Sequence, residues 1–159
     1  MPAQQLLTTP ERQLVKDDEV DELKKLIFTG LHEVDDHIDH FSKHTMLHDA
    51  VAFNREELFY FLIRQGANPM VRDANGQTPL LKAAALNRLD MVKTLIEEAK
   101  CDPGHVDPHG VSPREKAQLY QLAEMSDYLE KMEQKAKAGD FKAKDWSEFR
   151  RRNATIFDY

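Results

Sequence analysis

Apolar positions in the middle of the chain recur with the spacing of an amphipathic α-helix. The stripe consists of Leu89, Met91, Val92, Leu95 and Ile96. Residues three and four apart share one face of a helix, so this stripe predicts a helix that buries one side. No apolar run approaches the roughly 18 residues that a membrane-spanning helix needs, and no membrane span is expected.

A shorter helix is predicted immediately before this stripe. Thr78 can cap its N-terminus, and Pro79 suits the first helical position, where a missing N–H costs nothing. Ala83 and Ala84 are small, so a neighbouring helix can approach closely. Asn87 lies where the first helix should turn into the second. The segment therefore predicts a pair of short helices.

The same pattern returns every 33 or 34 residues. A fixed period of this length is typical of stacked repeats, in which one unit cannot bury its own faces. Three sets of positions keep the spacing: Thr45, Thr78 and Ser112; Ala50, Ala83 and Ala117; Leu62, Leu95 and Leu129.

The amino-acid sequence of the middle unit resembles a known repeat. It reads Asp-Ala-Asn-Gly-Gln-Thr-Pro-Leu-Leu-Lys-Ala-Ala from Asp73 to Ala84, and the preceding unit closes with Gly-Ala-Asn-Pro from Gly66 to Pro69. This resembles the ankyrin repeat, with its D-x-x-G-x-T-P-L-H-x-A-A start and G-A-D/N finish, over about residues 20–132. The resemblance implies an all-α fold: a solenoid of helix-turn-helix units with short β-hairpin loops, followed by a C-terminal tail or helical arm.

Departures from the repeat pattern indicate where the regions of the chain begin and end. Lys43 stands where glycine is usual and Met46 where proline is usual, whereas Arg114 replaces a core leucine, as suits a terminal capping repeat. Thr9-Pro10-Glu11 can start a short extra helix. The expected regions are an N-terminal extension (1–19), a half-cap (20–38), two repeats (39–71 and 72–105), a capping repeat (106–132), and a helix extension to Gly139 that continues as a basic, aromatic arm (133–159).

Charge and cysteine content narrow the classes of function. The 159 residues are 41% hydrophobic and 31% charged, with a net charge of −6. The charge is −6 over residues 1–40, −2 over 41–132 and +2 over 133–159, so the repeats lack the clustered cations that nucleic acid requires. One cysteine, Cys101, excludes a disulfide framework. We expect a cytoplasmic protein, with the nucleus as the other compartment that suits a reduced thiol.

Two histidine-containing clusters raise the question of a metal site. His40, His44 and His48 have i, i+4 spacing, and Cys101, His105 and His109 are likewise four apart. The first run crosses a hairpin, and His48 fills the histidine slot of the repeat, which implies structural hydrogen bonds. The second spacing matches no zinc module. We expect no metal and no cofactor, and a metal-binding protein remains an alternative.

Catalytic motifs are not found in the sequence. It contains no G-x-S-x-G, no phosphate-binding loop and no G-x-G-x-x-G. Paired carboxylates such as Asp17-Asp18 are most simply explained as solvated surface. We expect a protein that is not an enzyme and has no catalytic residues.

The resemblance implies protein binding on a concave face, formed by the hairpin tips and the ends of the first helices. Phe53, Leu86 and Tyr120 occupy one equivalent position in three units and should align there, beside Ala52, Ala85 and Leu119. Apolar side chains on an exposed face are typical of interfaces. The predicted contact residues are Phe41, His44, Phe53, Arg72, Asn75, Gln77, Leu86, His109, Leu119 and Tyr120.

The C-terminal arm offers a second surface. Trp146 and Phe149 would share a helix face, and Arg150, Arg151 and Arg152 follow directly. Such a segment can dock on an acidic protein surface, for example that of tubulin or actin. It can equally fold back over the chain's own Phe53, Leu86 and Tyr120, and the sequence leaves both possibilities open.

These observations favour a non-catalytic adaptor or a small structural subunit of a larger assembly, such as a cytoskeletal one. Its partners would be proteins in a hetero-complex rather than nucleic acid or membrane. The alternative within the same class is an inhibitor or regulator that masks a partner's active or localisation surface.

Overall fold

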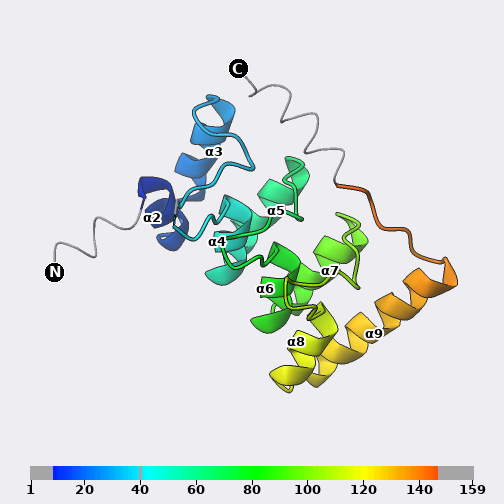
Figure 1. Cartoon of the computed structure of the whole chain (residues 1–159). Coiled ribbons are helices and arrows are strands. Elements are labelled where there is room, and N and C mark those ends of the chain that lie inside the picture. The colour runs from blue at the N-terminus through cyan, green and yellow to red at the C-terminus, as the bar shows by residue number, and fades with distance from the viewer. Residues whose placement is uncertain (1–8, 40, 147–159) are drawn as a thin grey trace.

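The computed structural model describes residues 9–39 and 41–146. Regular structure in these residues is helical, and the one β contact among them is an isolated bridge between His37 and Thr45. The helices lie in two layers: α2, α4, α6 and α8 form one, and α3, α5, α7 and α9 form the other (Figure 1). The helices are α2 (Pro10–Lys16), α3 (Val20–Phe28), α4 (Met46–Ala52), α5 (Glu56–Arg64), α6 (Pro79–Ala85), α7 (Leu89–Glu97), α8 (Pro113–Leu119) and α9 (Ala123–Ala138).

Each first helix begins at a hydroxyl cap. In all four units the side-chain oxygen accepts a hydrogen bond from the backbone N–H three residues on, which satisfies one of the free N–H groups of the first turn. The predicted cap at Thr78 is confirmed, and its donor is the N–H of Leu81. The capping residues are Thr9, Thr45, Thr78 and Ser112.

The turn between the two helices of a unit also repeats. The residue two places beyond each first helix has a positive φ, between 55° and 60°. Asparagine, aspartate and glutamine are found there, and the first two tolerate the left-handed conformation better than most residues. The predicted turn at Asn87 is confirmed. The four residues are Asp18, Asn54, Asn87 and Gln121.

One glycine is required by a close approach. Gly76 has a φ of 74°, and a Cβ added there would lie 2.2 Å from Cγ of Pro108 in the next hairpin. Gly110 occupies the same place in the next unit with a φ of 81° and has nothing within 4 Å of an added Cβ. Lys43, noted above as a departure from glycine, adopts the same conformation with a φ of 55°. The backbone shape is thus common to three units, whereas the steric demand for glycine is specific to Gly76.

The N-terminal unit contains both of its helices. Helix α2 lies within the expected extension, packs on α3 and α4, and completes a pair with α3. The expected start of an extra helix at Thr9-Pro10-Glu11 is therefore confirmed. Val15 of α2 and Leu23 of α3 are both fully buried. The second half of a unit predicted at 20–38 is thus preceded by a first half.

The loops between units have the outline of hairpins without forming strands. The N–H of Asp73 donates to the carbonyl of Gln77 at 2.9 Å, and the N–H of Asp107 donates to that of Val111 at 3.0 Å. Neither pair extends into a ladder in the described residues. The β-hairpin loops expected from the resemblance are tight turns here.

The core lies between the two layers and is closed at the C-terminal end by polar residues. Phe59, Leu80 and Leu95 are fully buried. Arg114, at the position of Leu80 in the last unit, instead lies 3.3 Å from the carboxylate of Glu133 on α9, which agrees with a capping repeat. Gly139 ends α9 in the left-handed conformation, as predicted. Among the described residues, none of the helices is both long enough and apolar enough to cross a membrane.

Candidate protein-binding face

Leu86 and Tyr120 lie exposed at equivalent positions of successive units. Each is the residue that ends a first helix, α6 or α8, directly before the left-handed turn. Leu86 is 42% exposed, Tyr120 58% and the adjacent Leu119 72%. We call these three residues the concave patch. Because the side chains are large and apolar, the patch has the composition of an interface core.

Phe53 does not belong to this patch, although it ends α4 at the same position. Its ring packs partly against the core, and Nζ of Lys16 lies 5.6 Å from the ring centroid. Lys16 belongs to α2, which the sequence comparison of units did not place over this residue. The predicted row of three side chains is therefore reduced to two, with Leu119 beside them.

The hairpin tips divide into exposed and structural residues. Phe41 is 77% exposed, and Asn75 and His109 are also exposed. Arg72 is partly buried, and its guanidinium donates to the carbonyls of Gly76 at 2.6 Å and Val106 at 3.1 Å. These bonds tie one hairpin to the next, so Arg72 has a structural role whatever else it contacts.

Gln77 makes a second connection between hairpins. Its amide Nε2 donates to Oδ2 of Asp107 at 3.2 Å, and its carbonyl receives Nε2 of His48 at 3.0 Å. Three consecutive units therefore meet at this residue. A partner could reach Gln77 only in part, since its side chain is half-buried.

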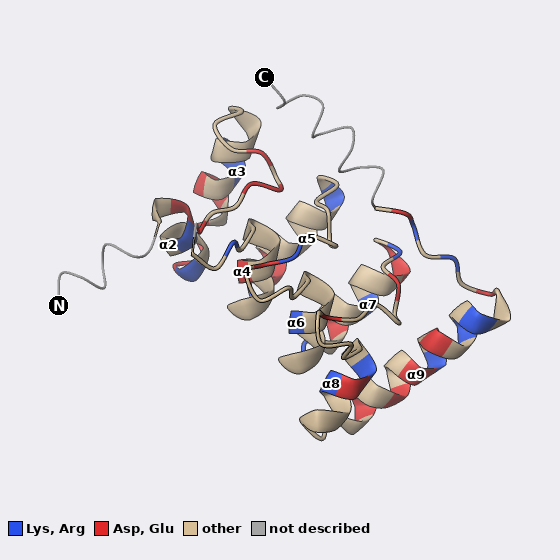
Figure 2. Ribbon diagram, viewed as in Figure 1, with Lys and Arg blue, Asp and Glu red and all other residues tan. Residues whose placement is uncertain are grey.

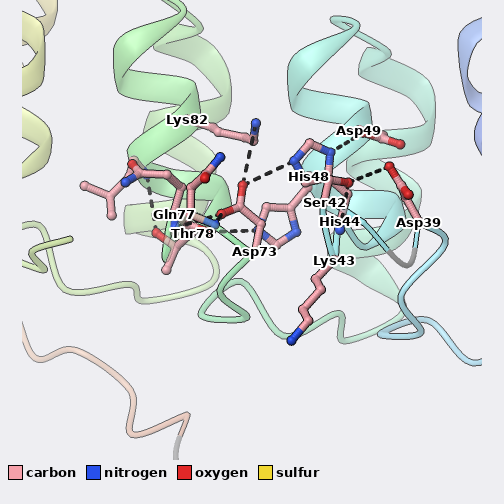
Figure 3. A network of polar contacts seen from close by, with 12 residues as sticks. Asp39, Ser42, Lys43, His44, His48, Asp49, Asp73, Gln77, Thr78 and Lys82 are labelled. Carbon is pink, nitrogen blue, oxygen red and sulfur yellow. Dashed lines mark hydrogen bonds and ion pairs between the residues drawn. The ribbon is translucent and has the colours of Figure 1, made fainter. Parts of the chain in front are cut away.

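His44, one of the predicted partner contacts, is buried in the structure. Only 7% of the residue is exposed. Its Nδ1 lies 2.7 Å from a carboxylate oxygen of Asp49, and its Nε2 lies 3.2 Å from Asp73 (Figure 3). Nζ of Lys82 approaches the same Asp73 oxygen at 3.8 Å. The imidazole thus connects α4 to the next hairpin inside the protein.

The sequence did not reveal that aspartates organise the hairpins. Oδ1 of Asp73 accepts the N–H groups of Asn75 and Gln77, and Oδ1 of Asp107 accepts those of His109 and Val111. The N–H of Val111 contributes most to holding the pKa of Asp107 well below its usual range. The D-x-x-G spacing was the available signal, because an aspartate before a turn commonly accepts N–H groups two residues on.

His48 makes the structural bonds that the repeat pattern implied. Its Nδ1 accepts the N–H of Thr45 at 3.2 Å. Its Nε2–H donates to the carbonyl of Gln77 (Figure 3). The ring stacks on His44 with centroids 5.4 Å apart. Burial lowers the pKa of His48 to about 4, because the charged form would lose its solvation.

Trp146, the first of the predicted arm contacts, is buried in the structure. The residue is only 8% exposed, and its indole N–H donates to the carbonyl of Ala99 at 3.0 Å. The N–H of Lys144 donates to the carbonyl of Lys100 at 2.8 Å. The start of the arm therefore packs on the loop that follows α7. The other predicted arm residues, Phe149, Arg150, Arg151 and Arg152, lie outside the described residues.

The metal-binding alternative gains no support from the described residues. No three of their histidine, cysteine, aspartate or glutamate side chains come together with the geometry of a metal site. Cys101 is fully buried, and burial raises the pKa of its thiol to about 12. His109 is exposed on the hairpin, and His40 lies outside the described residues. At neutral pH a thiol in this environment is a poor ligand and a poor nucleophile.

Comparison with known proteins agrees with the helix pairs and their caps. The family described as ankyrin repeats (three copies) matches residues 13–131. Glycerophosphocholine phosphodiesterase gde1 of Schizosaccharomyces pombe is 35% identical over 89 residues, which is 55% of this chain and 8% of that protein. Diacylglycerol kinase zeta of Rattus norvegicus is 36% identical over 97 residues, 59% of this chain and 10% of the kinase.

A third relative matches a shorter stretch. The 2-5A-dependent ribonuclease of Homo sapiens is 48% identical over 40 residues, 25% of this chain and 5% of that enzyme. The chain thus covers a tenth or less of each of these relatives. They are similar to it through the repeat region alone, so their enzymatic names do not imply catalysis here. The family match spans most of the chain and coincides with the stacked helix pairs, and the chain therefore belongs to the ankyrin-repeat family.

Proposed function

We propose that this protein is a non-catalytic binding module that holds an apolar segment of a partner protein on its concave patch. Ankyrin repeats are generally protein-interaction modules, which supports the class of function. The observation that carries the proposal is the exposure of Leu86 and Tyr120 at equivalent helix ends. Side chains that a fold does not bury itself, at matching positions in successive units, are available to a partner.

The geometry also indicates the character of the contact. Lys82 of α6 and Lys116 of α8 each lie within 4 Å of a hairpin aspartate, Asp73 or Asp107. Their charges are therefore largely compensated inside the protein. A partner that meets this face finds a neutral, apolar centre at Leu119 and its neighbours, which favours an apolar or aromatic anchor over a charged one.

The proposal includes a setting for this contact. We infer an adaptor or a small structural subunit of a cytoplasmic hetero-complex, with a cytoskeletal assembly as one possible host. The partly compensated charges near the first helices favour protein over nucleic acid as the partner. A partner enzyme that loses activity when bound would identify the protein as an inhibitor instead.

Affinity capture with matched variants tests the proposal. The baits are the natural chain, Leu86→Ala/Tyr120→Ala, and Phe28→Ala/Leu31→Ala as a control that removes exposed apolar surface elsewhere. We expect a set of proteins that the natural chain and the control retain and that the first variant loses. Equal capture by all three baits would refute a role for the concave patch.

A further inference from the structure

A second exposed apolar patch lies at the opposite end of the repeat stack. Phe28 is 67% exposed at the end of α3, and Leu31 is 70% exposed just after it. We call these two residues the α3-end patch. The rings of Phe28 and Phe61 meet edge to face, with centroids 5.8 Å apart. Sequence reasoning did not single out this patch, although two large apolar residues three apart were the available signal.

The C-terminal segment already runs along the edge of the stack that leads to this patch. Gly139 ends α9, and five residues later Lys144 is hydrogen-bonded at Lys100, beyond the end of α7. Figure 1 shows this segment passing from the end of α9 toward the ends of α7 and α5. The chain therefore crosses from one repeat to the next in about five residues, and Trp146 fixes it there.

The remaining length suffices to reach the α3-end patch. Thirteen residues, 147–159, follow Trp146. Fully extended, they can span about 43 Å. Two more repeats separate the end of α7 from the end of α3, and packed helices lie roughly 8–10 Å apart. At five residues per repeat, a chain continuing along this edge would bring Ile156 and Phe157 to Phe28 and Leu31.

The charges along this path are complementary. The loop after α3 carries Glu33, Asp35 and Asp36, and Figure 2 shows this loop as a red stretch between α3 and α4. Oδ1 of Asp35 accepts the N–H of Asn68, which places the loop between the ends of α3 and α5. At the same spacing, a chain continuing along this edge would bring Arg150, Arg151 and Arg152 into this interval.

Two of these carboxylates have no lysine or arginine partner among the described residues. Within residues 9–39 and 41–146, neither Glu33 nor Asp35 forms an ion pair with a lysine or arginine. Oδ2 of Asp36 lies 3.6 Å from Nδ1 of His32 and accepts the N–H of Glu33 at 2.8 Å. Burial raises the pKa of Asp35, as expected of a carboxylate without a nearby cation. Arg64 at the end of α5 carries a like charge, and the three carboxylates of the loop outnumber it.

We propose that residues 147–159 dock along this edge of the chain's own repeats, with the arginines at the acidic loop and the final apolar residues on the α3-end patch. The segment would act as a strap that joins the last repeat to the first. It would leave the concave patch free for a partner. The occupant is this chain's own C-terminus, which the length, direction and charge of the path all favour.

A spin label at the C-terminus tests this placement in the full chain. Tyr159→Cys provides the attachment point, because buried Cys101 with its raised pKa does not react under native conditions. The spin-labelled, ¹⁵N-enriched chain is diluted with ¹⁴N chain that carries no spin label, so that only effects within one chain are seen. Its amide NMR signals are recorded with the spin label oxidised and then reduced. We expect the signals of residues 28–36 to be lost in the oxidised state, and those of residues 82–86 to be retained.

Matched variants make the result specific. Phe28→Ser/Leu31→Ser should restore the signals of residues 32–36, whereas Leu86→Ser/Leu119→Ser should leave them lost. Loss of signals around Leu86 and Tyr120 would place the segment in the concave face and overturn the proposal. A mixture of spin-labelled ¹⁴N chain and ¹⁵N chain without the spin label tests for a second copy. Loss of signals in this mixture alone would show that a second copy is the occupant. Unchanged signals in every sample would exclude docking, and either result would overturn the proposal.

Discussion

The middle repeat, α6 with α7, and the last repeat, α8 with α9, share one backbone and bury different surfaces. Both first helices start at a capped proline and end at a left-handed turn. Leu80 is fully buried in the middle repeat, whereas Arg114 at the same position is partly exposed beside Glu133. Caps and turns thus set the backbone of a unit, and the neighbouring units determine which residue its faces need.

The ends of the first helices follow a different rule. Leu86 is exposed in an internal repeat and Tyr120 in the terminal one. Exposure here does not result from a missing neighbour, because α6 has neighbours on both sides. The position is therefore free of a folding role in both repeats, which is what a binding position requires.

The two repeats should differ most in how much stability they lose when Leu80 or Arg114 is replaced by alanine. Leu80→Ala leaves a cavity in a fully buried site and should lower the free energy of unfolding by about 2–5 kcal/mol. Arg114→Ala removes partly exposed ion pairs and should cost less than about 1 kcal/mol. Urea denaturation of both variants measures the difference. Equal losses would show that the last repeat is packed like an internal one.

The first repeat differs from the middle one by a titrating residue, because His48 stands where the middle repeat has Leu81. The pKa of His48 is about 4 in the folded protein and 6.5 ordinarily, so between these values the unfolded chain binds the extra proton. Stability should therefore fall as pH drops from 6.5 toward 4, by roughly 3 kcal/mol at most. The ring faces His44, Asp73 and Lys82, whose charges act on the pKa of His48.

NMR titration of the His48 ring measures this pKa directly. A midpoint near 6.5 would contradict the burial and hydrogen bonding described above. Denaturation of His48→Gln across the same pH range is the control, and its stability should vary less with pH than that of the natural chain.

A smaller difference in stability is expected between alanine variants of the two hairpin glycines, Gly76 and Gly110. Both Gly76→Ala and Gly110→Ala place a Cβ on a residue with positive φ, at a cost of about 1 kcal/mol. At Gly76 the new Cβ also meets Pro108, which should add about 1–3 kcal/mol. The difference in urea midpoint between the two variants measures the second cost alone. A Pro108→Ala background should remove most of it.

The smallest effect on stability is expected at the concave patch. Leu86→Ala and Tyr120→Ala remove exposed side chains, so each should change the free energy of unfolding by less than about 0.5 kcal/mol. Thermal denaturation of the two variants provides the measurement. A loss above about 2 kcal/mol would show that these residues support the fold, and the contrast with Leu80 would fail.

The sequence predicted the repeats well because their signals are local. The cap at Thr78, the turn at Asn87 and the stop at Gly139 each depend on a few adjacent residues, and all three are confirmed. The period of 33 or 34 residues then places the same elements in each unit.

The exposure of the predicted contact residues was harder to predict, because it depends on other units. His44 is covered by Asp49 and by Asp73 of the next hairpin, and Phe53 by Lys16 of a helix before it. Trp146 packs at Ala99, 47 residues away in the sequence. No pattern within one unit reports such contacts. Leu86 and Tyr120 are exposed at the helix ends that the repeat pattern assigned to the surface.

The central claim is that the concave patch holds the partner, and a binding measurement tests it most directly. The partner captured by the natural chain is titrated by calorimetry into the natural chain, Leu86→Ala/Tyr120→Ala, and the control Phe28→Ala/Leu31→Ala. With about 2 kcal/mol for each anchor, the first variant should bind at least tenfold more weakly while remaining folded. The control should bind as the natural chain does. Unchanged affinity of Leu86→Ala/Tyr120→Ala would contradict the account.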